Sequence, residues 1–180
     1  MRLFIDPGHG GTDSGAIGPT GFKEKDFCFQ VAEILQLACE HAGWKTMWSR
    51  DHDANVSELQ SALNANAWEA DYYVSIHANG AGPQAHGCEV LYWNSSVRGR
   101  VWAVQLQDEL LSRFPQIRNR GLKPKFPGDR GATVLRRTTM PAVLVETAFI
   151  TNPDEEKFLR RFSTQAMIAD AILSSLDSTI

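Results

Sequence analysis

The stretch Leu3-Phe4-Ile5-Asp6-Pro7-Gly8-His9-Gly10-Gly11 joins a short apolar segment to a glycine-rich turn that carries a histidine. Its apolar residues predict a β-strand over residues 2–5. Glycine tolerates backbone conformations that other residues avoid, so the turn can present the His9 imidazole at the end of this strand. The same arrangement recurs downstream, where Tyr72-Tyr73-Val74-Ser75-Ile76 predicts a strand and His77 follows it directly. Two histidines are therefore expected at the ends of two strands.

Length and composition indicate a single globular domain. The chain has 180 residues, of which 43% are apolar and 22% are charged, so residues 1–180 can enclose one sizeable core. The net charge of -3 gives no sign of a nucleic-acid-binding surface, although such a chain can still bind a large polar polymer in a groove. Cys28, Cys39 and Cys88 are too few for a disulfide framework and are expected to be buried apolar residues.

No segment of the sequence predicts membrane insertion or export. There is no apolar run of eighteen residues, so no transmembrane segment is expected. Met1 is followed at once by the first predicted strand, which leaves no room for a signal peptide. A protein acting outside the cell would then need another route of release, or its leader has been removed.

Strands and helices alternate along the chain, which predicts a three-layer α/β domain with helices on both faces of the sheet. Strands are expected at residues 2–5, 45–49, 72–76, 88–93 and 142–146, and helices at 24–42, 58–70, 97–114 and 154–176. Residues 117–130, rich in proline and glycine, are expected to form a loop. The segment 142–146 is apolar until its last residue, Glu146, which is typical of a central strand buried on both faces.

His9, His77 and Glu146 all fall at or just past the carboxyl end of a predicted strand, where open α/β sheets bind ligands. Glu24 follows a glycine-rich loop that can fold it back toward His9, although alone it would pass for a first-turn acid that favours the helix dipole. Catalytic zinc commonly takes two histidines and one glutamate and leaves a fourth position for water. His9, Glu24 and His77 meet this ligand count.

Glu146 would be costly to bury without a partner. A carboxylate beside a metal-activated water can take the proton of that water and return it to a leaving amine. The four residues together therefore indicate metal-assisted amide hydrolysis. The remaining histidines are expected to be incidental, although His86 lies in the loop after the His77 strand and could approach the site. The aromatic residues Trp93, Trp102 and Phe126 either pack internally or line a groove.

The sequence around these residues resembles the zinc-dependent N-acetylmuramoyl-L-alanine amidases that have one compact α/β catalytic domain. The matching blocks are IDPGHGG at residues 5–11, EKD at 24–26, ADYYVSIHAN at 70–79, NRGLK at 119–123 and PAVLVETAFITN at 141–152. They occur in family order and span nearly the whole chain, and their combination is far more specific than any one block. The resemblance implies a twisted, mostly parallel sheet flanked by helices, with residues 1–180 as the amidase catalytic domain.

The resemblance also implies the roles of the site residues. One Zn²⁺ per chain would be held by His9, Glu24 and His77, with Glu146 as the catalytic carboxylate. The substrate would be peptidoglycan, cut at the amide between the lactyl group of N-acetylmuramic acid and the L-alanine of the stem peptide. Asn79 and Arg120 would contact the substrate. The chain departs from many relatives at two positions, since Ser61 stands where they have Arg and Ala148 where they have Gly.

The resemblance further implies a protein that acts on the cell wall, and we expect it to be a monomer that binds no nucleic acid. Members of the family often carry a wall-binding module, which here would lie outside this chain. Without a signal peptide, the chain suits an endolysin released through a membrane hole, while an exported autolysin that has lost its leader is the alternative. Two other functions stay open: a zinc peptidase acting on sugar-free peptides, and a wall-binding module that has lost catalysis.

Overall fold

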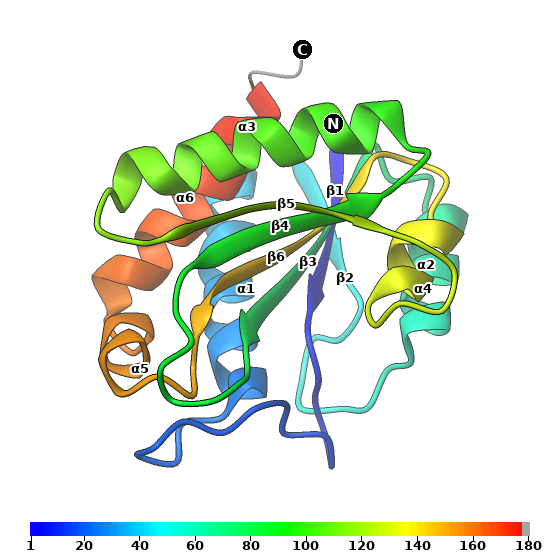
Figure 1. Ribbon diagram of the computed structural model, residues 1–180. Coiled ribbons are helices and arrows are strands. Elements are labelled where there is room, and N and C mark those ends of the chain that lie inside the picture. The colour runs from blue at the N-terminus through cyan, green and yellow to red at the C-terminus, as the bar shows by residue number, and fades with distance from the viewer. Residues whose placement is uncertain (178–180) are drawn as a thin grey trace.

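A computed structural model describes residues 1–177 of the chain and contains one six-stranded sheet (Figure 1). The strands lie in the order β2-β1-β3-β6-β4-β5, and every neighbouring pair is parallel except β4 and β6. The predicted mostly parallel α/β sheet is therefore confirmed. The bounds of the strands are β1 Arg2–Pro7, β2 Lys45–Trp48, β3 Tyr72–Asn79, β4 Cys88–Trp93, β5 Asn119–Lys125 and β6 Ala142–Phe149.

Helices cover both faces of the sheet. The larger core contains buried residues of α1 (Glu24–His41), α3 (Val97–Arg113) and α6 (Phe162–Asp177), which therefore share one face. The smaller core lies on the other face, under α2 (Glu58–Ala67) and α4 (Ala132–Arg137). A short helix, α5 (Pro153–Leu159), follows β6 beyond its carboxyl end (Figure 1). None of these helices is both long and apolar enough to cross a membrane, judged over residues 1–177.

Local sequence explains where several helices begin and end. The Ser57 hydroxyl accepts a hydrogen bond from the backbone N–H of Gln60 and caps α2, and Ser96 caps α3 in the same way. Asn152 accepts from two backbone N–H groups of α5, with Pro153 at the first helical position. Gly43 follows the end of α1 with φ +79°, a conformation that glycine adopts at low cost.

The two central strands, β3 and β6, are buried on both faces. Alternate residues of β1 and β3 enter different cores, so Ile5 and Val74 belong to the larger core and Phe4 and Tyr73 to the smaller one. A slip of one residue in register would exchange these two sets and turn every polar side chain of the strand to the wrong face. The register of the central strands is therefore strongly specified by packing.

Two expectations about secondary structure are wrong. Residues 117–130 were expected to form a loop, but Asn119–Lys125 is the edge strand β5, which pairs with β4. Pro124 is tolerated at an edge, and Gly121, with φ +78°, lies where the register with β4 shifts. The helix expected over 154–176 is divided into α5 and α6 near Arg160, and neither proline nor glycine marks the break. The short helix α4 was not expected.

Two leucines of α1 make a matched test of the core. Leu35 is fully buried, whereas Leu37 is 67% exposed on the same helix. We predict that Leu35→Ala lowers the free energy of unfolding by about 2–5 kcal/mol, because it leaves a cavity as well as removing apolar contact. Leu37→Ala should change it by less than about 0.5 kcal/mol. Denaturant titration measures both, and equal effects of the two substitutions would contradict this packing of α1.

Candidate metal centre and catalytic pocket

The register of the sheet aligns three acidic or histidine side chains in one row. In the parallel pair β3–β6, His77 lies opposite Glu146, and in the antiparallel pair β6–β4, Glu146 lies opposite Glu89. Residues aligned across neighbouring strands project from the same face of a sheet. Because Leu144, two residues before Glu146, belongs to the smaller core, this row lies on the face that carries α2 and α4, beyond that core.

Glu24 joins the two histidines at the end of this row. Its Oε1 lies 3.0 Å from His77 Nδ1 and its Oε2 lies 3.1 Å from His9 Nε2. One ligand atom from each residue lies within 4.8 Å of the others, and within residues 1–177 this is the one group of three that could hold a metal ion. Ligands of a tetrahedral zinc ion are about 3.3 Å apart at bond lengths of about 2.0 Å. The spacing therefore suits a small cation.

The environment of His9 fits a metal ligand. Asp13 Oδ2 lies 2.9 Å from His9 Nδ1, so a proton on Nδ1 is shared with the carboxylate and the Nε2 lone pair is left for the site. His9 Nε2 is buried, and its approach to Glu24 lacks the geometry of a hydrogen bond. A carboxylate behind a histidine is the usual support of a zinc ligand. The donor set and its support both fit zinc.

Glycines make room for the two imidazole rings. A Cβ atom at Gly8 would overlap the ring of His77, and one at Gly15 would press against both His9 and Glu24. His9 itself has φ +61°, a left-handed conformation that is uncommon for a residue with a side chain. The glycine-rich turn is thus needed to place the ring, as the sequence predicts.

Electrostatics couple the three residues. Burial raises the pKa of the Glu24 carboxyl, but the hydrogen bond with His77 and the charges of His77 and His9 outweigh burial and hold this pKa well below its usual value. Burial lowers the pKa of His77, yet Glu24 overrides this effect and raises it to about 9. The pKa of His9 is raised by Glu24 in the same way, against burial. Without a metal, protons therefore hold the group together, and a cation would replace them.

Glu146 lies in the same pocket as the three candidate ligands. The pocket has a volume of about 850 Å³ and runs from the His9 turn to the amino end of α4. Burial raises the pKa of the Glu146 carboxyl to about 7, while His77 opposes this shift. Its Oε2 is buried and has no hydrogen-bond partner. A carboxyl with a pKa near neutrality, facing a pocket, is suited to transfer protons in either direction.

Arg50 stands in no recognisable motif, yet it connects the segments that supply His9 and Glu24. Its buried guanidinium donates hydrogen bonds to the carbonyl oxygens of Pro7 (3.1 Å), Gly8 (3.1 Å) and Lys25 (3.0 Å). Pro7 and Gly8 precede His9, and Lys25 follows Glu24. A single planar donor therefore fixes the distance between two candidate ligands. Only the folded structure could reveal this role, because the acceptors are backbone atoms.

Glu156 holds the far end of the glycine-rich loop. This fully buried carboxylate accepts hydrogen bonds from the backbone N–H groups of Thr20 and Phe22 and from the Thr20 hydroxyl at 2.8 Å. A Cβ atom at Gly18 would overlap the Glu156 side chain. The loop is thus anchored at both ends, by Arg50 and by Glu156, and delivers Glu24 to a fixed place.

Ser61, one of the two departures from many relatives, belongs to a polar network beside the site. Its hydroxyl donates to Asp6 Oδ1 at 2.8 Å and also lies 2.8 Å from the Tyr73 hydroxyl. Ser75 donates to the second oxygen of Asp6 at 2.6 Å. Asp6 is therefore satisfied without an arginine at position 61.

The two expected substrate contacts both bind Glu89. Asn79 Nδ2 donates to Glu89 Oε1 at 3.1 Å, and Arg120 Nε donates to Glu89 Oε2 at 2.8 Å. The Arg120 guanidinium also lies 4.8 Å from the centre of the Phe149 ring. Asn79 lines the pocket, whereas Arg120 stands on β5 rather than in a loop and does not line it. Glu89 alternates with apolar neighbours in its strand, as a solvent-facing residue would, so no pattern in the sequence distinguishes it.

The residues expected to be incidental lie apart from the metal group. His86 Nδ1 is 3.0 Å from the carbonyl oxygen of Gln84, and His86 does not line the pocket. Trp102 is fully buried, Trp93 packs against the smaller core and Phe126 is half exposed. None of the three aromatic residues lines the pocket.

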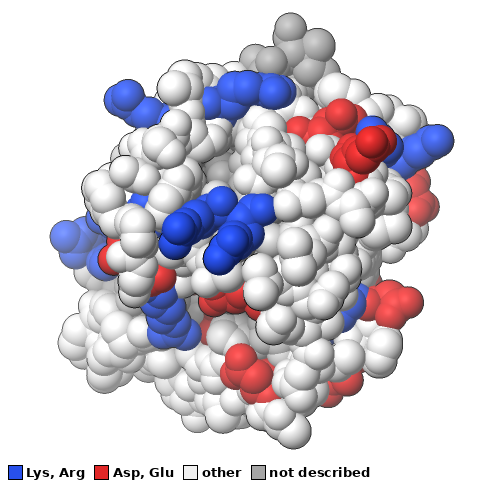
Figure 2. Space-filling model, turned by 90° about the vertical axis from the view of Figure 1, so that its right-hand side faces the viewer, with Lys and Arg blue, Asp and Glu red and all other residues white. Residues whose placement is uncertain are grey.

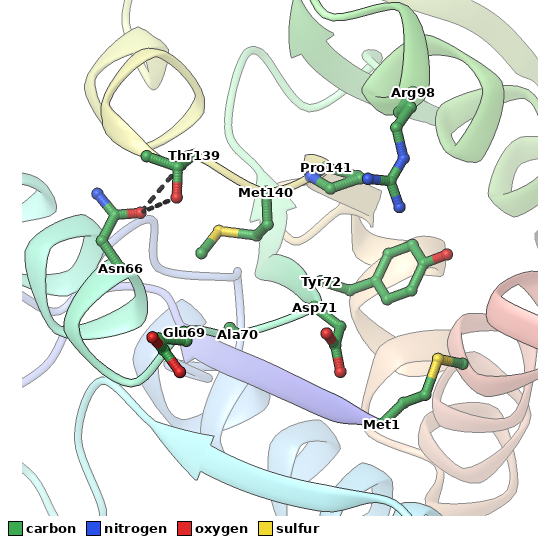
Figure 3. Close-up of a pocket in the computed structure, with 10 residues that line it drawn as sticks. All are labelled: Met1, Asn66, Glu69, Ala70, Asp71, Tyr72, Arg98, Thr139, Met140 and Pro141. Carbon is green, nitrogen blue, oxygen red and sulfur yellow. Dashed lines mark hydrogen bonds between the residues drawn. The ribbon is translucent and has the colours of Figure 1, made fainter.

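A second pocket, of about 390 Å³, lies at the opposite end of the sheet (Figure 3). Met1, Asp71, Tyr72 and Met140 border it, close to the amino ends of β1, β3 and β6, and Thr139, also in its lining, hydrogen-bonds with Asn66. It contains no histidine or cysteine. The chemistry is therefore concentrated at the carboxyl edge.

Sequence comparison gives the family. A protein-family model described as N-acetylmuramoyl-L-alanine amidase matches residues 3–178 of the sequence. The chain belongs to this amidase family. The uncharacterised protein YqiI of Bacillus subtilis is 36% identical over 179 residues, covering 98% of this chain and 83% of YqiI. The amidase CwlM of Bacillus licheniformis is 34% identical (89% of this chain, 61% of CwlM), and the endolysin of Bacillus phage SPP1 is 35% identical (89% and 59%). The chain thus spans only about three fifths of the length of CwlM and of the phage endolysin.

Solved structures agree with this family assignment. The amidase AmiC2 of Nostoc punctiforme superposes with a TM-score of 0.89 at 32% identity, covering 99% of this chain and 96% of that one. An N-acetylmuramoyl-L-alanine amidase from Clostridium difficile 630 gives a TM-score of 0.90 at 34% identity, covering 98% and 95%. The predicted family and fold class are both confirmed.

Loss of Arg50 should loosen this amidase-family site. We predict that Arg50→Ala speeds amide hydrogen exchange at residues 8–10 and 25–27 and lowers stability by about 2 kcal/mol or more, because several buried acceptors lose a charged donor. Arg50→Lys should recover only part of the loss, since one ammonium cannot span the same acceptors. Arg100→Ala, at an exposed position of α3, is the control and should leave exchange unchanged. Equal exchange rates at these residues in Arg50→Ala and in the parent protein would contradict this role of Arg50.

The raised pKa of His77 makes stability depend on pH when metal is removed. A folded pKa of about 9 against an unfolded value of 6.5 gives stabilisation that is complete below pH 6.5 and is lost as the pH rises through 9. The free energy of unfolding with a chelator present should therefore fall between pH 6.5 and 9.5. In His77→Asn the fall should be much smaller. Urea titrations across this range test it, and a rise with pH in the parent protein would be inconsistent with the His77–Glu24 pair.

Proposed function

We propose that this chain is a zinc-dependent N-acetylmuramoyl-L-alanine amidase. It hydrolyses the amide between the lactyl group of N-acetylmuramic acid and the L-alanine of the peptidoglycan stem peptide. The observation that carries the proposal is the closed group of His9, Glu24 and His77 with Glu146 beside it in one pocket. Relatives named as amidases and as an endolysin support the choice of substrate.

His9, Glu24 and His77 would hold one Zn²⁺, which when bound makes water acidic enough to ionise near neutral pH and polarises a carbonyl oxygen. Glu146 acts on the protons. Its carboxylate takes a proton from the attacking water and then returns it to the departing nitrogen of L-alanine. A pKa of about 7 suits both transfers, because neither form of the carboxyl is strongly favoured at neutral pH.

Asn79 and Arg120 are the residues proposed to contact the substrate, and Glu89 positions both of them. Glu89 binds both side chains and so sets how far each can reach toward a bound stem peptide. The two Nη groups of Arg120 make no hydrogen bond to any of residues 1–177 and remain available to a carboxylate. In this proposal residues 1–180 are one monomeric catalytic domain that acts on the cell wall, and any wall-binding module lies outside them. Release in the manner of an endolysin is the preferred route, with an exported autolysin as the alternative.

Digestion of purified cell walls tests the reaction. The protein should release intact stem peptides with a new L-alanine amino group, identified by mass spectrometry, and should carry about one zinc per chain. A chelator should abolish release, and added zinc should restore it. Cuts confined to the interior of the peptide would identify a peptidase instead, and wall binding without cleavage would identify a module that has lost catalysis.

Glu146→Gln separates proton transfer from metal binding. The variant keeps the shape of the side chain but cannot accept a proton, so turnover should fall by about 100-fold or more while zinc content and melting temperature persist. His77→Ala should lose zinc as well. Glu40→Gln, at an exposed position far along α1, is the matched control and should have parental activity. Retention of activity by Glu146→Gln would overturn the role assigned to Glu146.

A further inference from the structure

One segment of the chain carries a charge opposite to that of the whole protein. The chain has a net charge of -3, yet residues 118–137 contain seven of its 18 basic residues and only one of its 21 acidic residues, Asp129. The segment comprises the edge strand β5, the loop after it and α4. We call its basic residues the basic band: Arg118, Arg120, Lys123, Lys125, Arg130, Arg136 and Arg137.

The basic band borders the catalytic pocket. Lys125 and Arg130 line the same pocket as Glu146 and His77. Lys123, two residues before Lys125 on β5, lies 3.9 Å from Glu89 and so projects to the same face. Figure 2 views the face that carries α2 and α4, where Lys and Arg side chains cross the surface beside a recess that holds Asp and Glu side chains.

Acidic side chains of the protein neutralise only part of this band. Glu89 pairs with Arg120 and approaches Lys123. Across residues 1–177, the side chains of Lys125 and Arg130 form neither an ion pair nor a hydrogen bond. Gathering like charges beside a cleft raises the local concentration of anions. The pocket wall is therefore arranged to receive a negative group.

The opposite side of the pocket has the opposite character. Asp13 and Glu24 line it near the His9 turn, and Glu89 and Glu146 line it on β4 and β6, whereas Lys125 and Arg130 line it near the start of α4. A substrate that spans the pocket is thus offered a cationic wall on one side only. An acidic chain attached to the scissile amide would lie toward β5 and α4, and an uncharged sugar chain gains nothing from that wall.

We propose that Lys125 and Arg130, with the rest of the basic band beyond them, bind the carboxylates of the stem peptide and orient it across the pocket. This rests on the proposed amidase function. Because the band begins inside the pocket that contains Glu146, the anion it binds belongs to the molecule being cut and lies close to the reacting amide. A free carboxylate near L-alanine is consequently favoured over its amide.

Kinetics with soluble muramoyl peptides test the proposal. Two substrates would differ only in having a carboxylate or a carboxamide at the second residue of the peptide. Lys125→Gln/Arg130→Gln should raise KM for the carboxylate substrate about tenfold or more, with kcat little changed, and should barely affect the carboxamide. Arg98→Gln/Arg100→Gln on α3 removes the same charge outside the pocket and is the control. An equal effect of the pocket variant on both substrates would overturn the proposal.

Binding without catalysis distinguishes the source of the anion. Chelated protein would be sedimented with insoluble walls in three forms: untreated, stripped of phosphate-containing polymers, and with carboxyl groups converted to amides. Binding should survive phosphate removal, fall on amidation and weaken in Lys125→Gln/Arg130→Gln. Loss on phosphate removal would identify a phosphate polymer and refute carboxylate recognition. If carboxylate-dependent binding persists but the zinc-loaded protein cuts no muramoyl–alanine bond, the proposed function fails while carboxylate recognition stands.

Discussion

The carboxylate of Glu24, buried between the imidazoles of His9 and His77, is the interaction on which the site depends. A buried anion is tolerated only where positive partners and hydrogen bonds compensate for lost hydration. In the absence of a metal, protonated imidazoles provide that compensation, and a divalent cation can replace them. The glycine-rich loop, Arg50 and Glu156 all serve to bring this one carboxylate to the end of β3.

The parallel register of the central strands makes that meeting possible. β3 lies between β1 and β6, so segments remote in sequence end at the same edge, and His77 aligns with Glu146. The same register turns apolar residues into both cores and leaves the polar row at the edge. The fold and the site are therefore specified by one pattern, in which the apolar residues of β1, β3 and β6 lead to polar residues at the carboxyl ends of these strands.

Much of this arrangement could be predicted from the sequence, because strand-end histidines and an acid ending an apolar strand are local signals. The structure brings His9, Glu24, His77 and Glu146 together as expected. The strand β5 was missed since Gly121 and Pro124 are usual loop residues, and only pairing with β4 reveals it. Arg50 and Glu89 were missed for another reason: their partners are backbone carbonyls or distant side chains, which leave no pattern in the sequence.

The most direct test of the central claim is anomalous diffraction at the zinc edge from crystals of the zinc-loaded protein. We predict one strong peak bonded to His9, Glu24 and His77 at about 2.0–2.2 Å, with the fourth position open toward Glu146. A peak bound elsewhere, or no peak between these side chains in crystals that contain zinc, would contradict the account.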